Sequence, residues 1–286
     1  YAICRRKKQP DVRKKEKWKP YLDYVLKEQE WLKEHQEQEL KEIRSKDGLT
    51  LRAAYIPREN AKGTIICMHG YHSTNDIEFV PEVRFLWNLG YSILLPWQRS
   101  HGKSEGRYIT YGVKERHDLK RWILYTNRHL AAKNKDIFLC GISMGCATTL
   151  MAAGLDLPDN VKGIIADCGF TSPWDIIKHV AKERFHLPPF PLMYMVDLIS
   201  EVVAGFGLKE VSIPEIMKRN KIPVLFIHGD ADDYVPMWMT IKNYEACVAK
   251  KELYIVSGAG HALAFSKDME EGKRRIKNFI NKYKTI

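Results

Sequence analysis

A serine between two glycines is the residue of this chain best suited to nucleophilic chemistry. Residues 141–145 have the sequence Gly-Ile-Ser-Met-Gly and lie between an apolar run at 137–140 and a helical pattern that continues to residue 155. A turn this tight between a strand and a helix requires small residues at both glycine positions. It places Ser143 at the start of a helix, whose positive end favours a developing oxyanion. We therefore expect Ser143 to be a nucleophile.

A serine hydroxyl needs a base to remove its proton, and two later loops contain suitable side chains. Residues 228–236 have the sequence His-Gly-Asp-Ala-Asp-Asp-Tyr-Val-Pro, and residues 258–262 have the sequence Gly-Ala-Gly-His-Ala. Each loop directly follows an apolar run, so both would lie at the carboxyl ends of strands, where open α/β sheets place their sites. The order along the chain predicts Ser143 as nucleophile, Asp232 as the orienting acid and His261 as the general base.

The elements that must position these residues alternate along most of the chain. Short runs apolar on both faces, typical of parallel strands covered by helices, occur at 64–68, 92–95, 137–140, 161–166, 224–227 and 253–256. Stretches of helical periodicity lie at 81–89, 113–130, 143–155, 238–249 and 267–283. Asp47-Gly48, between segments 42–44 and 49–55, predicts a leading hairpin. We predict an α/β fold with a mostly parallel central sheet and helices on both faces.

One interval breaks this alternation. Between residues 170 and 222 lie two or three helical patterns and a proline-rich apolar patch, which together are too long for a loop in a compact domain. The predicted segments are a basic tail (1–19), an N-terminal helix (20–42), an α/β core in two parts (43–170 and 218–286) and a helical cap insertion (171–217).

The positive charge of the chain is concentrated near its start. The net charge is +11, and residues 1–20 hold nine Lys or Arg against Asp11 and Glu16, which is +7 of that total. The remainder is only modestly basic, so we expect no nucleic-acid partner. The tail predicts peripheral or anchored association with a membrane. We expect a cytoplasmic location, and the alternative is an anchor that precedes Tyr1.

The sequence predicts neither a metal nor a cofactor. Gly102-Lys103-Ser104 is similar to part of a phosphate-binding loop, but Trp97 stands where the first glycine is required. The six cysteines form no Cys-x-x-Cys pair, and there is no His-Glu-x-x-His segment to bind zinc. A disulfide framework is not expected in a chain of 286 residues, which favours a reducing compartment.

From about residue 43 to its end the chain resembles the α/β-hydrolase superfamily. Residues 228–236 are similar to the acid loop of that family, in the pattern His-Gly-x-x-Asp-x-x-Val-Pro that selects Asp232, and Gly260-His261 is similar to its histidine loop. His69-Gly70-Tyr71 resembles its oxyanion turn. By this likeness the backbone amides of Tyr71 and Met144 would hold the oxyanion.

Residues 99–104 resemble a further segment of the family, Asp-x-Arg-Gly-His-Gly-x-Ser, with two departures. Trp97 stands where an aspartate is usual, and Ser100 stands where a glycine is usual. The role of this segment in the family is mainly structural, so the departures concern local packing. His69, His101 and His228 all precede glycines, and we expect them to stabilise turns instead of reacting.

The resemblance is strongest to small bacterial serine hydrolases with an N-terminal helix and a helical cap, and it implies hydrolysis of carboxylic esters. The apolar insertion predicts a small-molecule ester substrate with apolar groups. Candidate substrate-binding residues are His72, Phe190, Met193, Tyr194 and Tyr234. A peptidase or a thioesterase on the same residues, and a non-catalytic binding protein of the same fold, remain alternatives. The substrate and the oligomeric state stay open.

Overall fold

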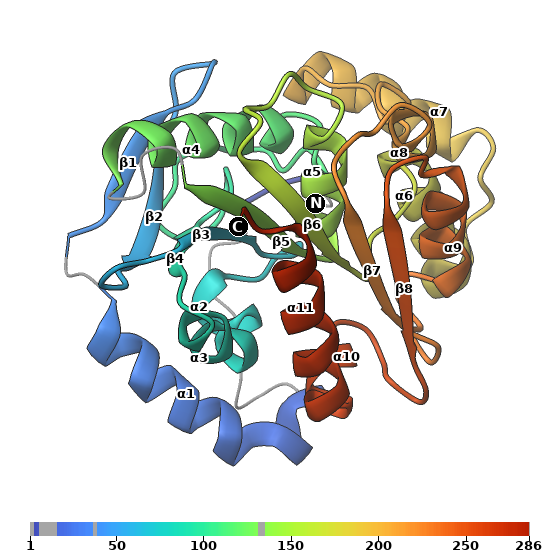
Figure 1. Ribbon diagram of the computed structural model, residues 1–286. Helices are drawn as coiled ribbons and strands as arrows, with labels where there is room; N and C mark the ends of the chain where they lie inside the picture. The colour runs from blue at the N-terminus through green and yellow to red at the C-terminus, as the bar shows by residue number, and fades with distance from the viewer. Residues whose placement is uncertain (1–2, 6–15, 37–38, 131–134, 286) are drawn as a thin grey trace.

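The computed structural model describes residues 3–5, 16–36, 39–130 and 135–285, and its centre is a twisted sheet (Figure 1). The strands of the described residues are β1 (Lys41–Arg44), β2 (Thr50–Ile56), β3 (Gly63–Met68), β4 (Ser92–Pro96), β5 (Asp136–Ile142), β6 (Val161–Asp167), β7 (Val224–Gly229) and β8 (Lys251–Val256). Their order in the sheet is β1-β2-β4-β3-β5-β6-β7-β8. Strands β1 and β2 form antiparallel pairs and the others run parallel. The predicted fold class is confirmed.

The parallel register aligns the carboxyl ends of the central strands. Met68 of β3 pairs with Gly141 of β5, and Ile142 of β5 pairs with Asp167 of β6. Every residue of β3, β5 and β7 is buried, as expected for strands that have helices on both faces. The loops that follow β3, β5 and β6 therefore meet at one edge of the sheet.

Helices lie on both faces of this sheet. They are α1 (Leu22–His35), α2 (Asn75–Glu78), α3 (Val80–Asn88), α4 (Glu115–His129), α5 (Met144–Ala152), α6 (Pro173–Phe185), α7 (Leu192–Ile199), α8 (Ile213–Met217), α9 (Met237–Ala246), α10 (Ala264–Lys267) and α11 (Met269–Tyr283). A 3₁₀ turn (Glu16–Tyr21) precedes α1, and a π-helical turn (Ser200–Ala204) follows α7. Helix α1 ends earlier than the predicted N-terminal helix, because the backbone becomes extended at Gln36, shortly before β1.

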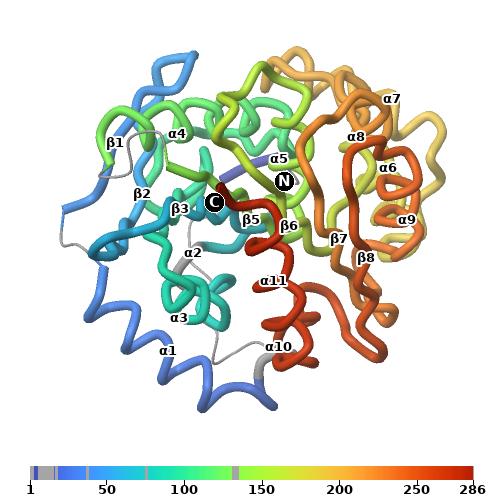
Figure 2. The backbone as a smooth tube through the Cα atoms, viewed as in Figure 1, coloured from blue at the N-terminus to red at the C-terminus, as the bar shows by residue number. Residues whose placement is uncertain are grey.

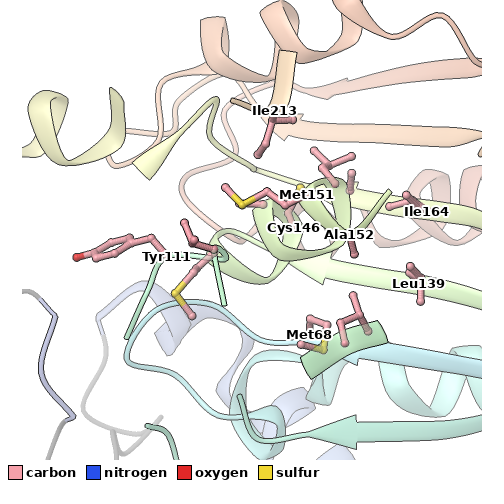
Figure 3. Close-up of a cluster of buried hydrophobic side chains, with 14 of the residues drawn as sticks. Met68, Tyr111, Leu139, Cys146, Met151, Ala152, Ile164 and Ile213 are labelled. Carbon is pink, nitrogen blue, oxygen red and sulfur yellow. The ribbon is translucent and has the colours of Figure 1, made fainter. Parts of the chain in front are cut away.

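The buried side chains form two clusters, one on each face of the sheet. One cluster joins Met68, Leu139 and Ile164 of the strands to α5 and α8 (Figure 3). The other joins the opposite strand faces to α1, α3 and α11. Helix α1 packs on the outside of α3, where the Tyr24 hydroxyl donates to the Pro81 carbonyl at 2.9 Å. The molecule thus has the three-layer arrangement expected of a parallel sheet.

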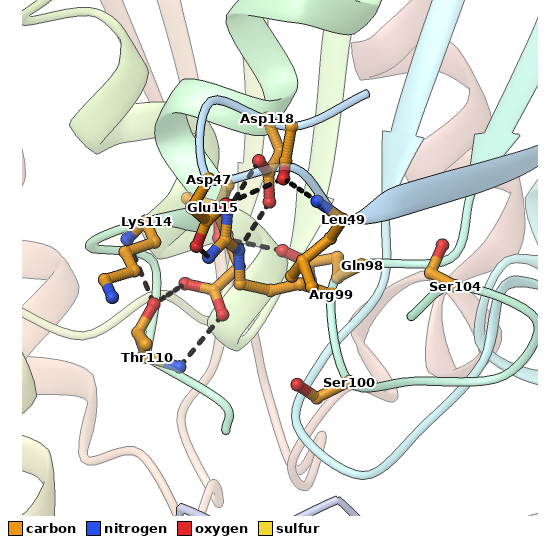
Figure 4. Close-up of polar contacts among 12 residues, drawn as sticks. Asp47, Leu49, Gln98, Arg99, Ser100, Ser104, Thr110, Lys114, Glu115 and Asp118 are labelled. Atoms are coloured by element: carbon orange, nitrogen blue, oxygen red, sulfur yellow. Dashed lines mark hydrogen bonds and ion pairs between the residues drawn. The ribbon is translucent and has the colours of Figure 1, made fainter. Parts of the chain in front are cut away.

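A buried arginine ties the hairpin to α4 (Figure 4). Arg99 donates to both carboxylate oxygens of Asp118, at 2.6 and 2.7 Å, and to Asp47 in the hairpin turn at 2.9 Å. Burial would lower the pKa of Arg99, but its bonds to Asp118 outweigh burial and raise it. The arginine therefore stays charged and connects two segments that are distant in the sequence.

Trp97 and Ser100, which differ from the residues usual at these positions in the family, both affect the local structure. Ser100 adopts φ +65°, a conformation that favours glycine, and its hydroxyl donates to the Tyr108 carbonyl at 2.7 Å. Trp97 is buried, and its ring occupies the space that a Cβ on Gly102 would fill. Residues 99–104 thus contribute to packing, as the sequence suggests.

The insertion between β6 and β7 is helical. It carries α6, α7, the π-helical turn and α8, and its yellow and gold part lies on the opposite side of the molecule from α1 (Figure 2). Helix α6 begins where Ser172 caps it, because the Ser172 Oγ accepts from the Asp175 amide at 3.0 Å and Pro173 takes the first helical position. Within the described ranges no helix has both the length and the apolar character needed to span a bilayer.

Candidate active site

Ser143 occupies a strained turn between β5 and α5. Its φ and ψ are 56° and −116°, an unusual conformation for a residue with a side chain. A Cβ on Gly145 would overlap the Met68 carbonyl oxygen, and a Cβ on Gly141 would overlap the Gly145 carbonyl oxygen. The Ser143 amide donates to the Asp167 carbonyl at 2.9 Å. Neighbouring backbone therefore excludes larger residues at both glycine positions and holds the serine at the edge of the sheet.

The structure brings Ser143, His261 and Asp232 into one hydrogen-bonded chain. His261 Nε2 lies 3.0 Å from Ser143 Oγ, and His261 Nδ1 lies 2.7 Å from Asp232 Oδ2. The Asp232 side chain is fully buried, whereas that of His261 is 17% exposed. An imidazole between a hydroxyl and a buried carboxylate can accept the hydroxyl proton while the carboxylate stabilises the resulting charge.

Asp232 is held as a carboxylate. Its Oδ1 accepts from the Tyr234 amide at 2.9 Å and from the Val235 amide at 2.8 Å. Burial alone would raise the pKa of Asp232, but hydrogen bonds from His228, His261 and Val235 lower it well below its ordinary value. The acid is thus ionised at neutral pH.

The two neighbouring aspartates have other partners. Asp230 accepts from the Gly258 amide at 2.6 Å, and Asp233 pairs with Arg184 at 3.2 Å. The loop therefore directs Asp232 alone of the three toward His261.

The remaining histidines of this edge contact backbone and neighbouring side chains. His228 places Nδ1 2.7 Å from Thr240 Oγ1 and Nε2 2.8 Å from the Val235 carbonyl. His69 accepts from the Gln98 amide at 3.1 Å, and His101 accepts from the His72 amide at 3.1 Å. All three hold turns, which agrees with the structural role expected from their positions.

The His69-Gly70-Tyr71 turn lies directly beside the nucleophile. A Cβ on Gly70 would lie 3.2 Å from Ser143 Cβ, so the turn and the elbow are in contact. The buried Glu78 accepts from the Gly70 amide at 2.5 Å and fixes the turn. Met144, the first residue of α5, is fully buried next to the serine. The turn of Tyr71 and the first residue of α5, Met144, are therefore both adjacent to Ser143.

An apolar cavity opens at Ser143. Its volume is about 240 Å³, and the side chains around it are apolar or tyrosine except for Ser143 itself. The core contributes Tyr71, Tyr111, Met144, Phe170, Tyr234 and Val235. The insertion contributes Ile176, Ile177, Val180, Ala181, Phe185, Leu187, Leu192 and Val196. Such a site favours an apolar group over a charged one.

The structure places only one of the five predicted pocket residues, Tyr234, at this cavity. Met193 is fully buried in the core, whereas Phe190 and Tyr194 are 76% and 55% exposed on the outside of the insertion. The His72 ring stacks on that of Tyr71, and its Nε2 lies 3.2 Å from the Cys4 carbonyl oxygen. Those four assignments are corrected, because the path of the chain turns these side chains away from the cavity.

The residues that the prediction missed carry a simple signal. Ile176 and Val180 of α6 are four residues apart, and so are Leu192 and Val196 of α7. Side chains at that spacing share one face of a helix, and in both helices that face lines the cavity. The spacing indicates which residues share a face of each helix, but not which face meets the cavity.

One group in the described part of the chain could offer three ligands to a metal ion. Atoms of Cys168, Asp232 and His261 lie within 4.8 Å of one another. However, Asp232 and His261 already bond each other at 2.7 Å. Burial and the nearby Asp167 and Asp232 carboxylates raise the pKa of the Cys168 thiol well above its ordinary value, so it stays protonated. The chemistry of this group therefore favours a hydrogen-bonded acid and base over a metal site.

Comparison with known proteins identifies relatives of the chain. Residues 104–285 match the model of the prolyl oligopeptidase family. The uncharacterised protein YqkD of Bacillus subtilis is 28% identical over 84% of this chain and 78% of its own length. The protein bem46 of Schizosaccharomyces pombe is 25% identical over 74% of this chain and 67% of its own length.

A solved structure supports the same assignment. The esterase Pf2001 of Pyrococcus furiosus is 26% identical, superposes with a TM-score of 0.72 and covers 90% of this chain and 94% of its own. The family match extends over more than half of the chain and includes both Asp232 and His261. The chain therefore belongs to the prolyl oligopeptidase family and is a hydrolase of the α/β-hydrolase superfamily.

Proposed function

We propose that this protein is a serine esterase that cleaves carboxylic esters with apolar acyl or alcohol groups. The observation that carries the proposal is the chain of hydrogen bonds from Asp232 through His261 to Ser143, which ends in an apolar cavity. The side chains proposed as nucleophile, base and orienting acid lie within hydrogen-bonding distance of one another, and the adjacent cavity can accept an apolar group of the substrate.

In the proposed reaction His261 takes the proton of Ser143 as Oγ attacks the ester carbonyl carbon. Asp232 holds the imidazole tautomer and stabilises the imidazolium that forms. The amides of Tyr71 and Met144 would donate to the negative oxygen of the tetrahedral intermediate. His261 then protonates the leaving alcohol, and water activated by the same imidazole hydrolyses the acyl-enzyme.

A peptidase is the second candidate, because the matching family model describes the prolyl oligopeptidase family. The cavity favours the ester. Apart from Ser143 and three tyrosines, the described side chains that line it are apolar, whereas binding of a peptide requires hydrogen-bond partners for its backbone amides and carbonyls. The similarity of 90% of the chain to the Pf2001 esterase of Pyrococcus furiosus also supports this choice.

Hydrolysis of p-nitrophenyl esters from acetate to long acyl chains tests the proposal, with wild type and Ser143→Ala measured in parallel. We expect activity in the wild type, an optimum at intermediate chain length set by the cavity, and a loss of roughly a million-fold in turnover in the variant. Near-normal turnover of Ser143→Ala would refute the assigned nucleophile. Cleavage of prolyl peptide substrates, with no cleavage of any ester, would favour the peptidase.

A further inference from the structure

The exposed apolar surface of the described residues is concentrated on the insertion. Eleven large apolar side chains are exposed in the described parts of the chain, and nine of them lie between residues 185 and 203. They are Phe185, Leu187, Phe190, Tyr194, Met195, Leu198, Ile199, Val202 and Val203, with Phe190 and Val202 more than three-quarters exposed. We call this set the insertion face. A concentration of this kind on a monomer marks a surface that binds something apolar.

Helix α7 shows why folding alone does not account for these side chains. Met193 faces the core, and Leu192 and Val196 face the cavity. The side chains of Leu198 and Ile199 remain in water on the same short helix. Asp197, which accepts from the Leu208 amide at 2.6 Å, is the charged residue of α7, and the other residues are apolar or tyrosine. A helix this apolar is usually buried, and this one is half covered. Its outer side is therefore suited to an apolar environment supplied from outside.

The insertion face continues into the cavity at Ser143. Phe185 is 66% exposed and Leu187 is 45% exposed, yet both also line the cavity. An apolar molecule can therefore pass from the outer surface to the serine without leaving apolar contact. A protein partner would not need this continuity, whereas a substrate that enters from a lipid phase would.

Cations border the insertion face. Lys178, Lys182 and Arg184 belong to α6, and Lys209 lies 3.8 Å from the Trp174 ring centroid and 4.5 Å from that of Tyr194. Lys182 pairs with Glu183 and Arg184 pairs with Asp233, each at 3.2 Å, but exposed ion pairs of this kind are weak and can exchange partners with headgroups. Long cationic side chains around an apolar surface are typical of proteins at a membrane interface, where they reach anionic headgroups. The insertion as a whole holds four Lys or Arg against six Asp or Glu, so most of the attraction to an anionic surface comes from the basic tail, which supplies +7 of the net charge of +11.

We propose that the insertion face docks on an anionic lipid bilayer, so that Phe190, Tyr194, Leu198 and Val202 enter the interface while the neighbouring cations contact phospholipid headgroups. The opening at Phe185 and Leu187 then faces the lipid, from which an ester with an apolar chain reaches Ser143. Docking itself is independent of the proposed ester hydrolysis, whereas delivery of substrate from the lipid rests on that proposed function.

Flotation of the full chain with vesicles tests the proposal. Vesicles of phosphatidylcholine with phosphatidylglycerol are compared with vesicles of phosphatidylcholine alone. The double variant Phe190→Ser/Val202→Ser removes two of the most exposed side chains of the face, and neither lines the cavity. Val248→Ser is the matched control, because Val248 is 67% exposed and lies outside the insertion.

We expect wild type and Val248→Ser to bind the anionic vesicles equally and the double variant to bind at least about tenfold more weakly, since it loses the burial of two large apolar side chains in the lipid. Equal binding by all three proteins would overturn the proposal. Absence of vesicle binding by all three proteins would also overturn it. In that case, a wild-type dimer that is lost in the double variant would assign the insertion face to a second copy of the chain.

Two readouts separate docking from catalysis. The double variant should hydrolyse p-nitrophenyl acetate in solution like the wild type, because its changes lie away from Ser143 and the cavity. Ser143→Ala should bind vesicles like the wild type although it is inactive. Loss of vesicle binding by Ser143→Ala would contradict docking through the insertion face. Absence of esterase activity with intact vesicle binding would contradict only the proposed function.

Discussion

Two aspartates near the nucleophile have their pKa values moved in opposite directions. Asp232 receives hydrogen bonds from His228, His261 and Val235, which outweigh its burial and lower its pKa. Asp167, at the end of β6, is buried near Glu82, and each carboxyl group has one oxygen that finds no hydrogen-bond partner in the described residues. Burial, and to a smaller extent the charges of Asp232 and Glu78, raise the pKa of Asp167 to about 7, although His228 opposes this. Asp232 is therefore suited to stabilise positive charge on His261. Asp167 is a buried acid whose loss of hydration is not offset by hydrogen bonds or positive charges.

Asp167→Asn should make the stability of the protein less dependent on pH. Between about pH 4 and pH 7, Asp167 is protonated in the folded protein but ionised in the unfolded chain, because folding raises its pKa. Its contribution to the free energy of unfolding therefore falls as the pH rises through this range. The asparagine variant lacks this loss and should gain on the order of a few kcal/mol relative to wild type at pH 8. Thermal unfolding between pH 4 and pH 8 measures the difference, with the exposed Asp159→Asn as control. Parallel curves for wild type and Asp167→Asn would contradict the raised pKa.

At the scale of elements, the ion pair of Arg99 fixes the hairpin β1–β2 against α4. The Arg99 and Asp118 side chains are 5% and 3% exposed, whereas that of Asp47 is 46% exposed. A buried charge that loses its partner is costly, and an exposed one is screened by water. The two aspartates should therefore contribute very differently to stability.

Asp118→Asn should destabilise the protein by about 3 kcal/mol, because Arg99 keeps its charge in a buried site. Asp47→Asn, the matched change on the other partner of Arg99, should cost about 1 kcal/mol or less, because its side chain is half exposed. Urea denaturation of both variants provides the comparison. Similar losses would show that burial does not govern this network.

The sequence predicted the sheet well, because strands that are apolar on both faces leave an unambiguous pattern. The predicted runs at 64–68 and 161–166 differ from β3 and β6 by one residue each. The short helices α2 and α10 were not predicted, since four residues are too few to show a period.

The helical insertion was predicted as an element, yet three of its side-chain assignments failed, at Phe190, Met193 and Tyr194. Which face of α7 meets the cavity depends on its packing against α6 and the core, and composition does not encode that.

At the scale of the whole molecule, the insertion face and the basic tail would act together at a charged surface. Headgroup attraction is screened by salt, whereas contact of apolar side chains with lipid is not. Raising the ionic strength should therefore weaken binding of the wild type to anionic vesicles without abolishing it.

The same salt titration should weaken binding of Phe190→Ser/Val202→Ser by a larger factor than binding of the wild type, because the electrostatic part is a larger share of the binding in a variant with fewer apolar contacts. Flotation in low and high sodium chloride, about 0.05 M and about 0.5 M, measures both parts. Salt-independent binding of the double variant would show that other apolar contacts hold the protein on the vesicle.

The separation in sequence between Ser143 and His261 has a consequence for biosynthesis. His261 follows Ser143 by 118 positions. At about 5–20 residues per second, the ribosome releases the base roughly 6–24 s after the serine. Strands β7 and β8 are translated during that interval, and they carry the loops of Asp232 and His261. A nascent or prematurely terminated polypeptide that ends before them therefore contains Ser143 without the two side chains that are hydrogen-bonded in line with it, so incomplete products would lack the proposed hydrolytic activity.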